Sequence, residues 1–99
     1  MRPDLPSDVE RAIDAFGNRV RVAVVTSLRT HGPSTRTDLA ARLDVSRSLL
    51  QSHMRRLVEL GVLRPEPAGM QADHRRRTYR VNEGEVERLL RALRASVAG

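Results

Sequence analysis

Hydrophobic residues recur along most of this chain at intervals of three and four positions, the period of an amphipathic helix. The stretch "DVERAIDAF" predicts a first helix over residues 8–16, with Ser7 as its N-cap and residues 1–7 as a flexible leader. Gly17 and Asn18 follow as a break. The apolar side of this helix comprises Val9, Ala12, Ile13 and Phe16.

The next stretch, "RVRVAVVTSLRTHG", fits two patterns. Its valines favour a strand, whereas Val22, Val25 and Leu28 follow helical spacing. A run of about 12 residues is long for a strand, so a buried helix is the better interpretation. Gly32 and Pro33 should end it.

Two further helices follow, separated by a tight turn. In "STRTDLAARLDV", Thr35 should cap a short helix and form a capping box with Asp38, and Leu39, Ala40 and Leu43 should face inward. After the turn at Asp44 and Val45, Ser46 should cap a helix over residues 46–60 that ends at Gly61. Its apolar side holds Leu50, His53, Met54 and Leu57, and its polar side holds Ser48, Gln51, Ser52, Arg55 and Glu59.

The remaining pattern predicts a hairpin and a last helix. "VLRPEP" and "HRRRTYRVN" read as two strands joined by "AGMQAD", together about residues 62–82. A helix over residues 83–97 then carries Val86, Leu89, Leu90, Leu93 and Val97 on one side. The prediction is a single domain over residues 8–99, mainly α with a small β-hairpin, in the order α-α-α-α-β-β-α.

Two helices joined by a tight turn, the second with short polar side chains near its start, form a helix-turn-helix. Such a helix lies in the major groove, where Arg pairs with guanine and Gln with adenine. Leu49 is either a core residue or a contact for a thymine methyl group. The candidate DNA-binding residues are Thr35, Arg36, Ser46, Arg47, Ser48, Gln51, Ser52, Arg55, Arg75, Arg76 and Arg77.

The predicted hairpin reads as a wing, a basic β-hairpin beside a helix-turn-helix. If Arg75 to Arg80 form one strand, alternation sends Arg75 and Arg77 to one face and Arg76 and Arg80 to the other. All four then cannot contact the same row of phosphates. The alternative is an edge strand kept soluble by its charges.

Charge supports a polyanionic partner. All 18 basic residues are arginine, and residues 18–82 hold thirteen of them against five acids, an excess of eight positive charges. The alternative is a merely solubilising surface, but an excess confined to one segment favours nucleic acid. With one Tyr, one Phe and no Trp there is no stacking platform for single-stranded bases, so duplex DNA is the better candidate.

The composition also excludes several classes of function. No cysteine is present, which excludes disulfides and soft-metal sites. No apolar run reaches the ~18–20 residues of a membrane span, and the start of the chain lacks the apolar core of a signal peptide. We expect a cytoplasmic protein without a cofactor or a metal. No nucleophile motif, phosphate loop or pair of acids in a pocket-like context points to an enzyme.

The segments "FGNRVRVAVV", "DLAARLDVSRSLLQSHMRRLVELGVL" and "DHRRRTYRVN" resemble winged-helix transcriptional repressors of the ArsR family. Asp73 and Arg75 in the wing are also similar to MarR-type regulators. The resemblance implies a homodimer on an inverted-repeat operator, recognition residues at Ser46, Arg47, Ser48, Gln51 and Ser52, and a packing role for His53.

The chain departs from family members that sense metals, because it has no cysteine. Its last helix has Glu83, Glu85 and Glu87 but no histidine, and His31 and His74 lie far apart in the sequence. We expect these glutamates to stabilise the helix N-terminus through the helix dipole.

Both ends of the chain carry more apolar surface than a monomer of this size readily hides. We therefore expect the helices over 8–16 and 83–97 to dimerise; the alternative is that they only cover the core of the same chain. The candidate dimer residues are Val9, Ile13, Phe16, Val86, Leu89, Leu90 and Leu93.

These features predict a sequence-specific regulator that binds double-stranded DNA as a homodimer, most simply a repressor. Two alternatives remain at this point. One is an accessory factor in phage or plasmid recombination or maintenance, and the other is a winged helix used only as a protein–protein interaction module. No effector pocket is evident in the sequence.

Overall fold

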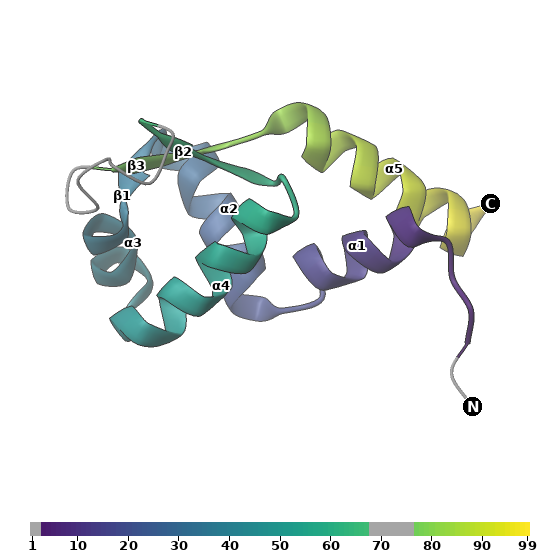
Figure 1. The fold of residues 1–99 in the computed structure, drawn as a ribbon, viewed down its shortest axis with the longest axis horizontal. Helices are drawn as coiled ribbons and strands as arrows, with labels where there is room; N and C mark the ends of the chain where they lie inside the picture. Colours follow the sequence, from purple (N-terminus) through teal and green to yellow (C-terminus); the bar gives the residue numbers. More distant parts are fainter. Residues whose placement is uncertain (1–2, 68–76) are drawn as a thin grey trace.

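The computed structural model describes residues 3–67 and 77–99, which form five helices and a small antiparallel sheet at one edge of the molecule (Figure 1). This confirms the predicted mainly helical class and the order of its elements, with one added strand. The elements are α1 (Ser7–Phe16), α2 (Arg19–His31), β1 (Ser34–Thr35), α3 (Arg36–Leu43), α4 (Arg47–Glu59), β2 (Leu63–Glu66), β3 (Thr78–Val81) and α5 (Glu83–Ala98).

The two N-terminal helices begin differently. Ser7 is the first residue of α1, and Pro6 precedes it without any capping hydrogen bond from a side chain, so the prediction of Ser7 as the N-cap is wrong. The stretch with two interpretations is the helix α2. Asn18 caps it, since its Oδ1 accepts from the backbone N–H groups of Val20 (2.9 Å) and Arg21 (3.2 Å).

The helix-turn-helix has the predicted local structure. Thr35 and Asp38 form the capping box of α3, with both hydrogen bonds at 3.1 Å. Asp44 takes the left-handed conformation at the turn (φ 53°), which Asp tolerates better than most residues. The Ser46 hydroxyl caps α4 by accepting from Leu49 N–H at 3.3 Å, and Gly61 turns the chain away after α4 with φ 80°.

The sheet has the order β1-β3-β2, so β3 is paired on both sides. The short β1, absent from the prediction, joins the start of α3 to β3 through the pairs Ser34–Tyr79 and Thr35–Thr78. The predicted arginine strand is shorter than expected, because β3 begins at Thr78, one residue after Arg77. Arg75 and Arg76, together with Asp73 and His74, lie outside the described residues.

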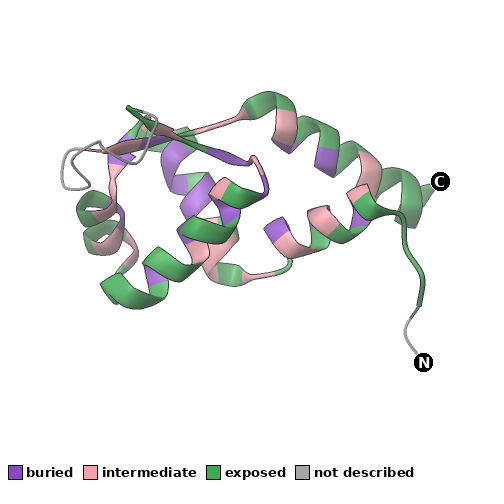
Figure 2. Cartoon of the chain, viewed as in Figure 1, coloured by how far each residue is buried: buried purple, intermediate pink, exposed green. Residues whose placement is uncertain are grey.

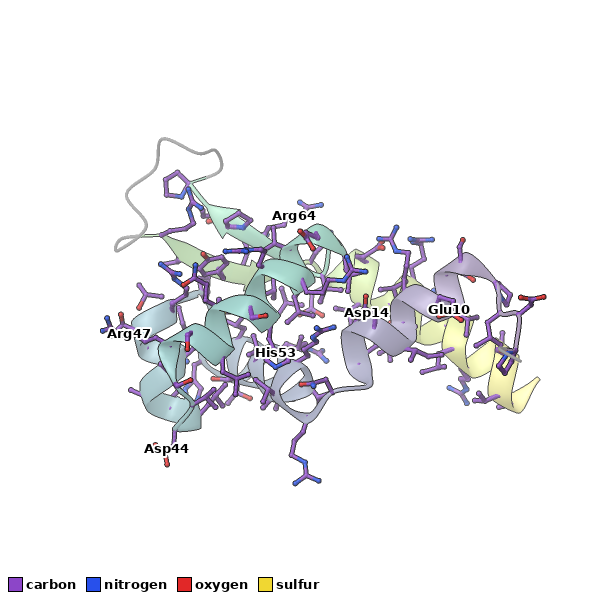
Figure 3. The ribbon with its side chains drawn as sticks, turned by 60° about the horizontal axis from the view of Figure 1, so that its bottom comes forward. Glu10, Asp14, Asp44, Arg47, His53 and Arg64 are labelled. Carbon is purple, nitrogen blue, oxygen red and sulfur yellow. The ribbon has the colours of Figure 1, made fainter. Side chains whose placement is uncertain are left out.

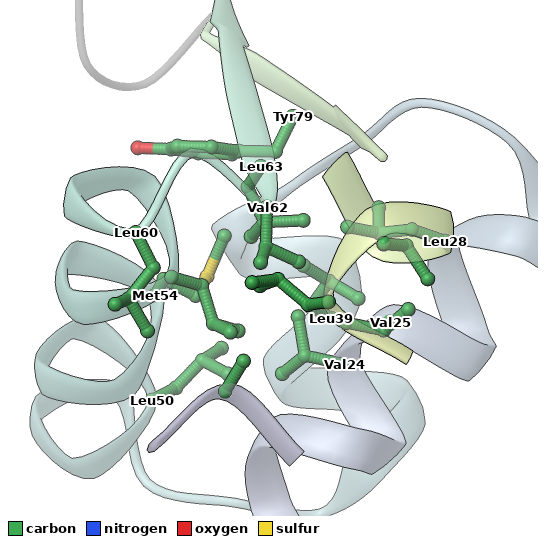
Figure 4. Close-up of a cluster of buried hydrophobic side chains, with 14 of the residues drawn as sticks. Val24, Val25, Leu28, Leu39, Leu50, Met54, Leu60, Val62, Leu63 and Tyr79 are labelled. Carbon is green, nitrogen blue, oxygen red and sulfur yellow. The ribbon is translucent and has the colours of Figure 1, made fainter. Parts of the chain in front are cut away.

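One core joins all the helices to the sheet (Figure 4). Leu39 of α3, Leu50 and Leu57 of α4, and Val24 of α2 are fully buried, and Tyr79 of β3 closes the cluster from the side of the sheet. In Figure 2 the buried positions face inward from each helix, while the outer side of α4 is exposed. The core therefore holds α4 by one side only.

Helices α1 and α5 pack against each other and extend away from α3 and the strands; we call them the terminal helix pair (Figure 1). Val9, Val86 and Leu89 are at most 5% exposed within the single chain, so three of the seven predicted dimer residues already fill the intrachain contact. Ile13 and Leu90 remain 43% and 44% exposed, and Phe16 and Leu93 are partly buried. The alternative that both helices cover their own chain is thus correct for part of the surface.

Within the described ranges, no helix is long and apolar enough to cross a lipid bilayer.

Candidate nucleic-acid interface

The outer side of α4 presents the polar side chains that the sequence singled out. Ser48, Gln51, Ser52 and Arg55 are spaced i, i+3, i+4 and i+7, which aligns them along one side of a helix. All four are exposed, as are Ser46 and Arg47 at the start of the helix, whereas Leu50, Met54 and Leu57 are buried. We call these six exposed residues the α4 face.

Part of the α4 face borders a cleft of about 240 Å³ beside the strands. Gln51 and Arg55 line it from α4, Arg36 from the start of α3, and Arg77 and Tyr79 from the strand side. Three arginines from three separate segments therefore converge here. Glu59, farther along α4, also lines the cleft and pairs with Arg56 at 3.4 Å, so the cleft carries one acidic side chain beside its three arginines.

Two candidate residues already use their side-chain oxygens inside the chain. Thr35 Oγ1 accepts from Asp38 N–H, and Ser46 Oγ accepts from Leu49 N–H. Each hydroxyl keeps its own proton to donate, and a phosphate oxygen is a suitable acceptor. The Thr35 hydrogen bonds also lower the pKa of the Asp38 carboxyl, with the bond from the Thr35 backbone N–H having the largest effect, so this carboxylate stays charged well below neutral pH.

Leu49 is 47% exposed, although its neighbour Leu50 is fully buried. Of the two interpretations left open by the sequence, the core residue is therefore wrong. Leu49 lies in the first turn of α4, one turn before His53 and next to Ser48, and adds an apolar group to an otherwise polar region.

Behind α4, an ionic network joins this helix to α1 and α2. Asp14 of α1 accepts from two arginines: Arg56 of α4 through Nε at 2.6 Å, and Arg21 of α2, whose Nη1 bonds both the Asp14 carboxylate and its backbone carbonyl. Arg21 Nε also donates to Nδ1 of His53 on α4 at 3.0 Å. In Figure 3, Asp14 on α1 and His53 on α4 are labelled where the two helices approach each other, whereas Arg47 lies at the start of α4, away from α1.

Two pKa values in this network are shifted. The hydrogen bond from Arg56 is the largest cause that lowers the pKa of Asp14, so this carboxylate stays charged well below neutral pH. Burial, and then the charge of Arg21, lower the pKa of His53. His53 is thus neutral at pH 7 and accepts a hydrogen bond within the chain, in agreement with the packing role that the resemblance implied.

The structure brings Arg36, Gln51, Arg55 and Arg77 together around the cleft and leaves the other predicted α4 residues exposed beside it. Arg80 faces solvent and pairs across the hairpin with Glu66 at 2.9 Å. Sequence reasoning missed the Asp14 network because Asp14 and Arg56 are 42 positions apart and no local pattern links them. By contrast, the Asn18 cap carried a usable signal, an Asn directly before a helical pattern.

The glutamates at the start of α5 have arginine partners. Glu85 accepts from Arg88 (2.8 Å) and Arg11 (3.1 Å), and Glu83 pairs with Arg29 at 3.3 Å. Among residues 3–67 and 77–99, no three His, Asp or Glu side chains are grouped so as to hold a metal ion.

Comparison with known proteins identifies the fold and the family. A family model described as a helix-turn-helix domain matches residues 16–66. A solved structure described as a possible transcriptional regulator for arsenical resistance is 33% identical, with a TM-score of 0.67 over 93% of this chain and 84% of that chain. An ArsR-like transcriptional regulator from Rhodococcus sp. RHA1 is 25% identical, with a TM-score of 0.74 over 93% of this chain and 79% of that one.

A MarR family transcription regulator shares the fold alone, at 14% identity and a TM-score of 0.60 over 93% of this chain and 62% of that chain. No curated protein matches the sequence. The family model covers just over half of the chain, including both helices of the motif and β2. The chain therefore belongs to the helix-turn-helix family and is a DNA-binding transcriptional regulator of the winged-helix, ArsR-like type.

Proposed function

We propose that this protein is a repressor that binds an inverted-repeat operator as a homodimer, with α4 in the major groove and the wing on the flanking backbone. The observation that carries the proposal is the division of α4: Leu50, Met54 and Leu57 fix the helix in the core, while the α4 face is free to enter a groove. A major groove about 12 Å wide admits such a helix.

The residues of the interface divide by role. Arg47 and Gln51 can each make two hydrogen bonds to one base edge, Arg to guanine and Gln to adenine, so we assign base recognition to them and to Ser48 and Ser52. Arg36, Arg55 and Arg77 gather at the cleft, a placement suited to phosphates. The hydroxyls of Thr35 and Ser46 add phosphate contacts near helix N-termini, and Arg75 and Arg76 remain candidates for the backbone.

Dimerisation through the terminal helix pair is supported by the apolar side chains that it leaves in water. Ile13, Leu90 and Val97 are 43%, 44% and 76% exposed. We assign the interface to Ile13, Phe16, Leu90 and Leu93, with Val9, Val86 and Leu89 supporting it from inside. Two α4 helices ~34 Å apart would then meet successive major grooves on one side of the duplex.

The test begins with selection of binding sites from random duplex DNA, followed by anisotropy titrations with the selected and a scrambled duplex. Arg47→Ala or Gln51→Ala should cost roughly 1–3 kcal/mol on the selected site and little on the scrambled one. Arg77→Ala should weaken both about equally and reduce the slope of log K against log salt by about 1. Arg91→Ala, which removes an exposed arginine on α5 that pairs with Glu87, is the matched control and should change neither.

Equal losses for Arg47→Ala, Gln51→Ala and Arg77→Ala on both duplexes would contradict the assignment of roles. Sedimentation equilibrium tests the dimer, which Leu90→Glu should dissociate. A reporter with the selected site in its promoter should be silenced by the wild-type protein; an active reporter would contradict repression.

A further inference from the structure

Ionic contacts join α4 to the terminal helix pair, in addition to the apolar core that they share. Helix α1 packs on α5 and on α2, and two of its charged side chains also bond directly to α4. Arg56 bonds Asp14 through Nε at 2.6 Å and Nη2 at 2.5 Å, and Arg11 donates from α1 to the carbonyl oxygen of Leu60, at the end of α4, at 2.7 Å. These directed bonds therefore add to core packing in fixing the position of α4 relative to α1.

Asp14 is the centre of these bonds. Its carboxylate receives Arg56 from α4 and Arg21 from α2, and Arg21 in turn holds His53 of α4. One side chain of α1 thus fixes two points of α4, directly through Arg56 and indirectly through His53. The side chains of Asp14 and Arg21 are only 30% and 18% exposed, so water competes less for the bond between them than for a surface pair, whereas Arg56 is 45% exposed.

We propose that Asp14 is the positioning residue that fixes α4 relative to the terminal helix pair and thereby sets the spacing of half-sites that the dimer accepts. The inference rests on the proposed function, because the terminal pair joins the two copies and α4 enters the groove. A two-base-pair change of spacer rotates one half-site by roughly 70° and moves it about 7 Å along the duplex. A dimer with α4 firmly held cannot follow such a change, whereas a dimer with α4 loosened can.

The chain offers a matched pair of variants. Asp14→Asn removes the charge that both arginines share, while the amide keeps the volume. Glu10→Gln makes the same change one turn earlier on α1, at an exposed side chain beside the same ionic cluster (Figure 3). Because both variants lose one negative charge, a difference between them reports the bonds rather than the net charge.

The first measurement uses the protein without DNA. The chain has no cysteine, so Thr37→Cys on the exposed side of α3 gives one spin label per copy and one distance across the dimer. Pulsed electron resonance should give a narrow distance distribution for the wild-type background and for Glu10→Gln. For Asp14→Asn the distribution should be at least about twice as wide, because hinge freedom between packed units broadens such distances.

The second measurement uses a series of operators with spacers changed by one and two base pairs. Wild type and Glu10→Gln should lose about tenfold or more in affinity when the spacer changes by two base pairs, and Asp14→Asn less than about threefold. A variant that was merely weakened would lose affinity for every spacer alike and would keep the wild-type ratio between them. An unchanged distribution width, or a uniform loss of affinity with the same spacing profile, would overturn the proposal. If Asp14→Asn does not fold, Arg56→Gln breaks the same link from α4, and an unchanged width in that variant also overturns it.

Failure of the proposed function would look different. A wild-type protein that is monomeric, or that binds single half-sites as well as inverted repeats, would remove the dimer on the operator altogether. A wild-type dimer with a strong spacing preference that Asp14→Asn retains would leave the proposed function intact and reject only the role of Asp14.

Discussion

Leu49 and Leu50 are adjacent in α4, yet replacing each by alanine should have opposite effects on stability and on DNA binding. The side chain of Leu50 is fully buried against the core, and that of Leu49 is 47% exposed. A buried Leu→Ala change loses the transfer free energy of the side chain and leaves a cavity, about 3 kcal/mol at a well-packed site. In a chain of this length that corresponds to a fall in Tm of roughly 12–24 °C.

For Leu49→Ala the loss of stability should stay under about 1 kcal/mol, because half of the side chain is already in water and Ala is the better helix former. The effect should instead appear on the selected duplex, where replacing thymine by uracil removes a methyl group that Leu49 can contact. We expect the wild-type protein to bind the uracil duplex more weakly than the thymine duplex, and Leu49→Ala to bind the two with equal affinity.

The assay is urea unfolding followed by circular dichroism, at one protomer concentration for all variants because dimerisation would add to the apparent stability. Anisotropy titrations on the thymine and uracil duplexes complete the comparison. Similar losses of stability for the two variants would refute the division of α4 into a buried and an exposed side. A Leu50→Ala variant as stable as wild type would refute the core described above.

Two further predictions concern groups near the interface. The pKa of His53 is lowered from 6.5 by burial and by Arg21, so the unfolded state binds the proton more readily than the folded state. The free energy of unfolding should therefore be fully retained above pH 6.5 and should fall as the pH drops through the lowered pKa. His53→Gln, whose amide oxygen can still accept from Arg21, should flatten this fall in urea titrations between pH 7.5 and pH 5, and an unchanged slope would count against it. Thr35→Ala should cost about 1 kcal/mol by removing the N-cap of α3, whereas Thr37→Ala, exposed on the same helix, should be near neutral; equal costs in thermal melts would contradict the capping role.

The sequence was most informative where structure is decided locally. Thr35, Asp38 and Ser46 cap helices through bonds that span only a few residues, and the alternation of apolar and polar positions placed the buried and exposed sides of α4 correctly. It was least informative where distant segments meet. The short strand at Ser34 exists only because β3 pairs with it, and the Asp14 network exists only after α1, α2 and α4 have packed.

The dimer residues illustrate the same limit. An apolar stripe predicts that a helix packs against something, but it does not say whether the partner is the same chain or a second copy. Val86 and Leu89 turned inward onto α1, whereas Leu90, one position later, stayed exposed. Only the three-dimensional placement separates these neighbours.

The arrangement of the small sheet also bears on how this protein behaves at high concentration. A foreign strand can extend a sheet only along a continuous row of unpaired backbone N–H and C=O groups. In the described strands, β3 is occupied on both sides, β1 is two residues long, and β2 contains Pro65, which has no N–H, between Arg64 and Glu66. Concentrated preparations should therefore resist conversion into fibrils through this sheet.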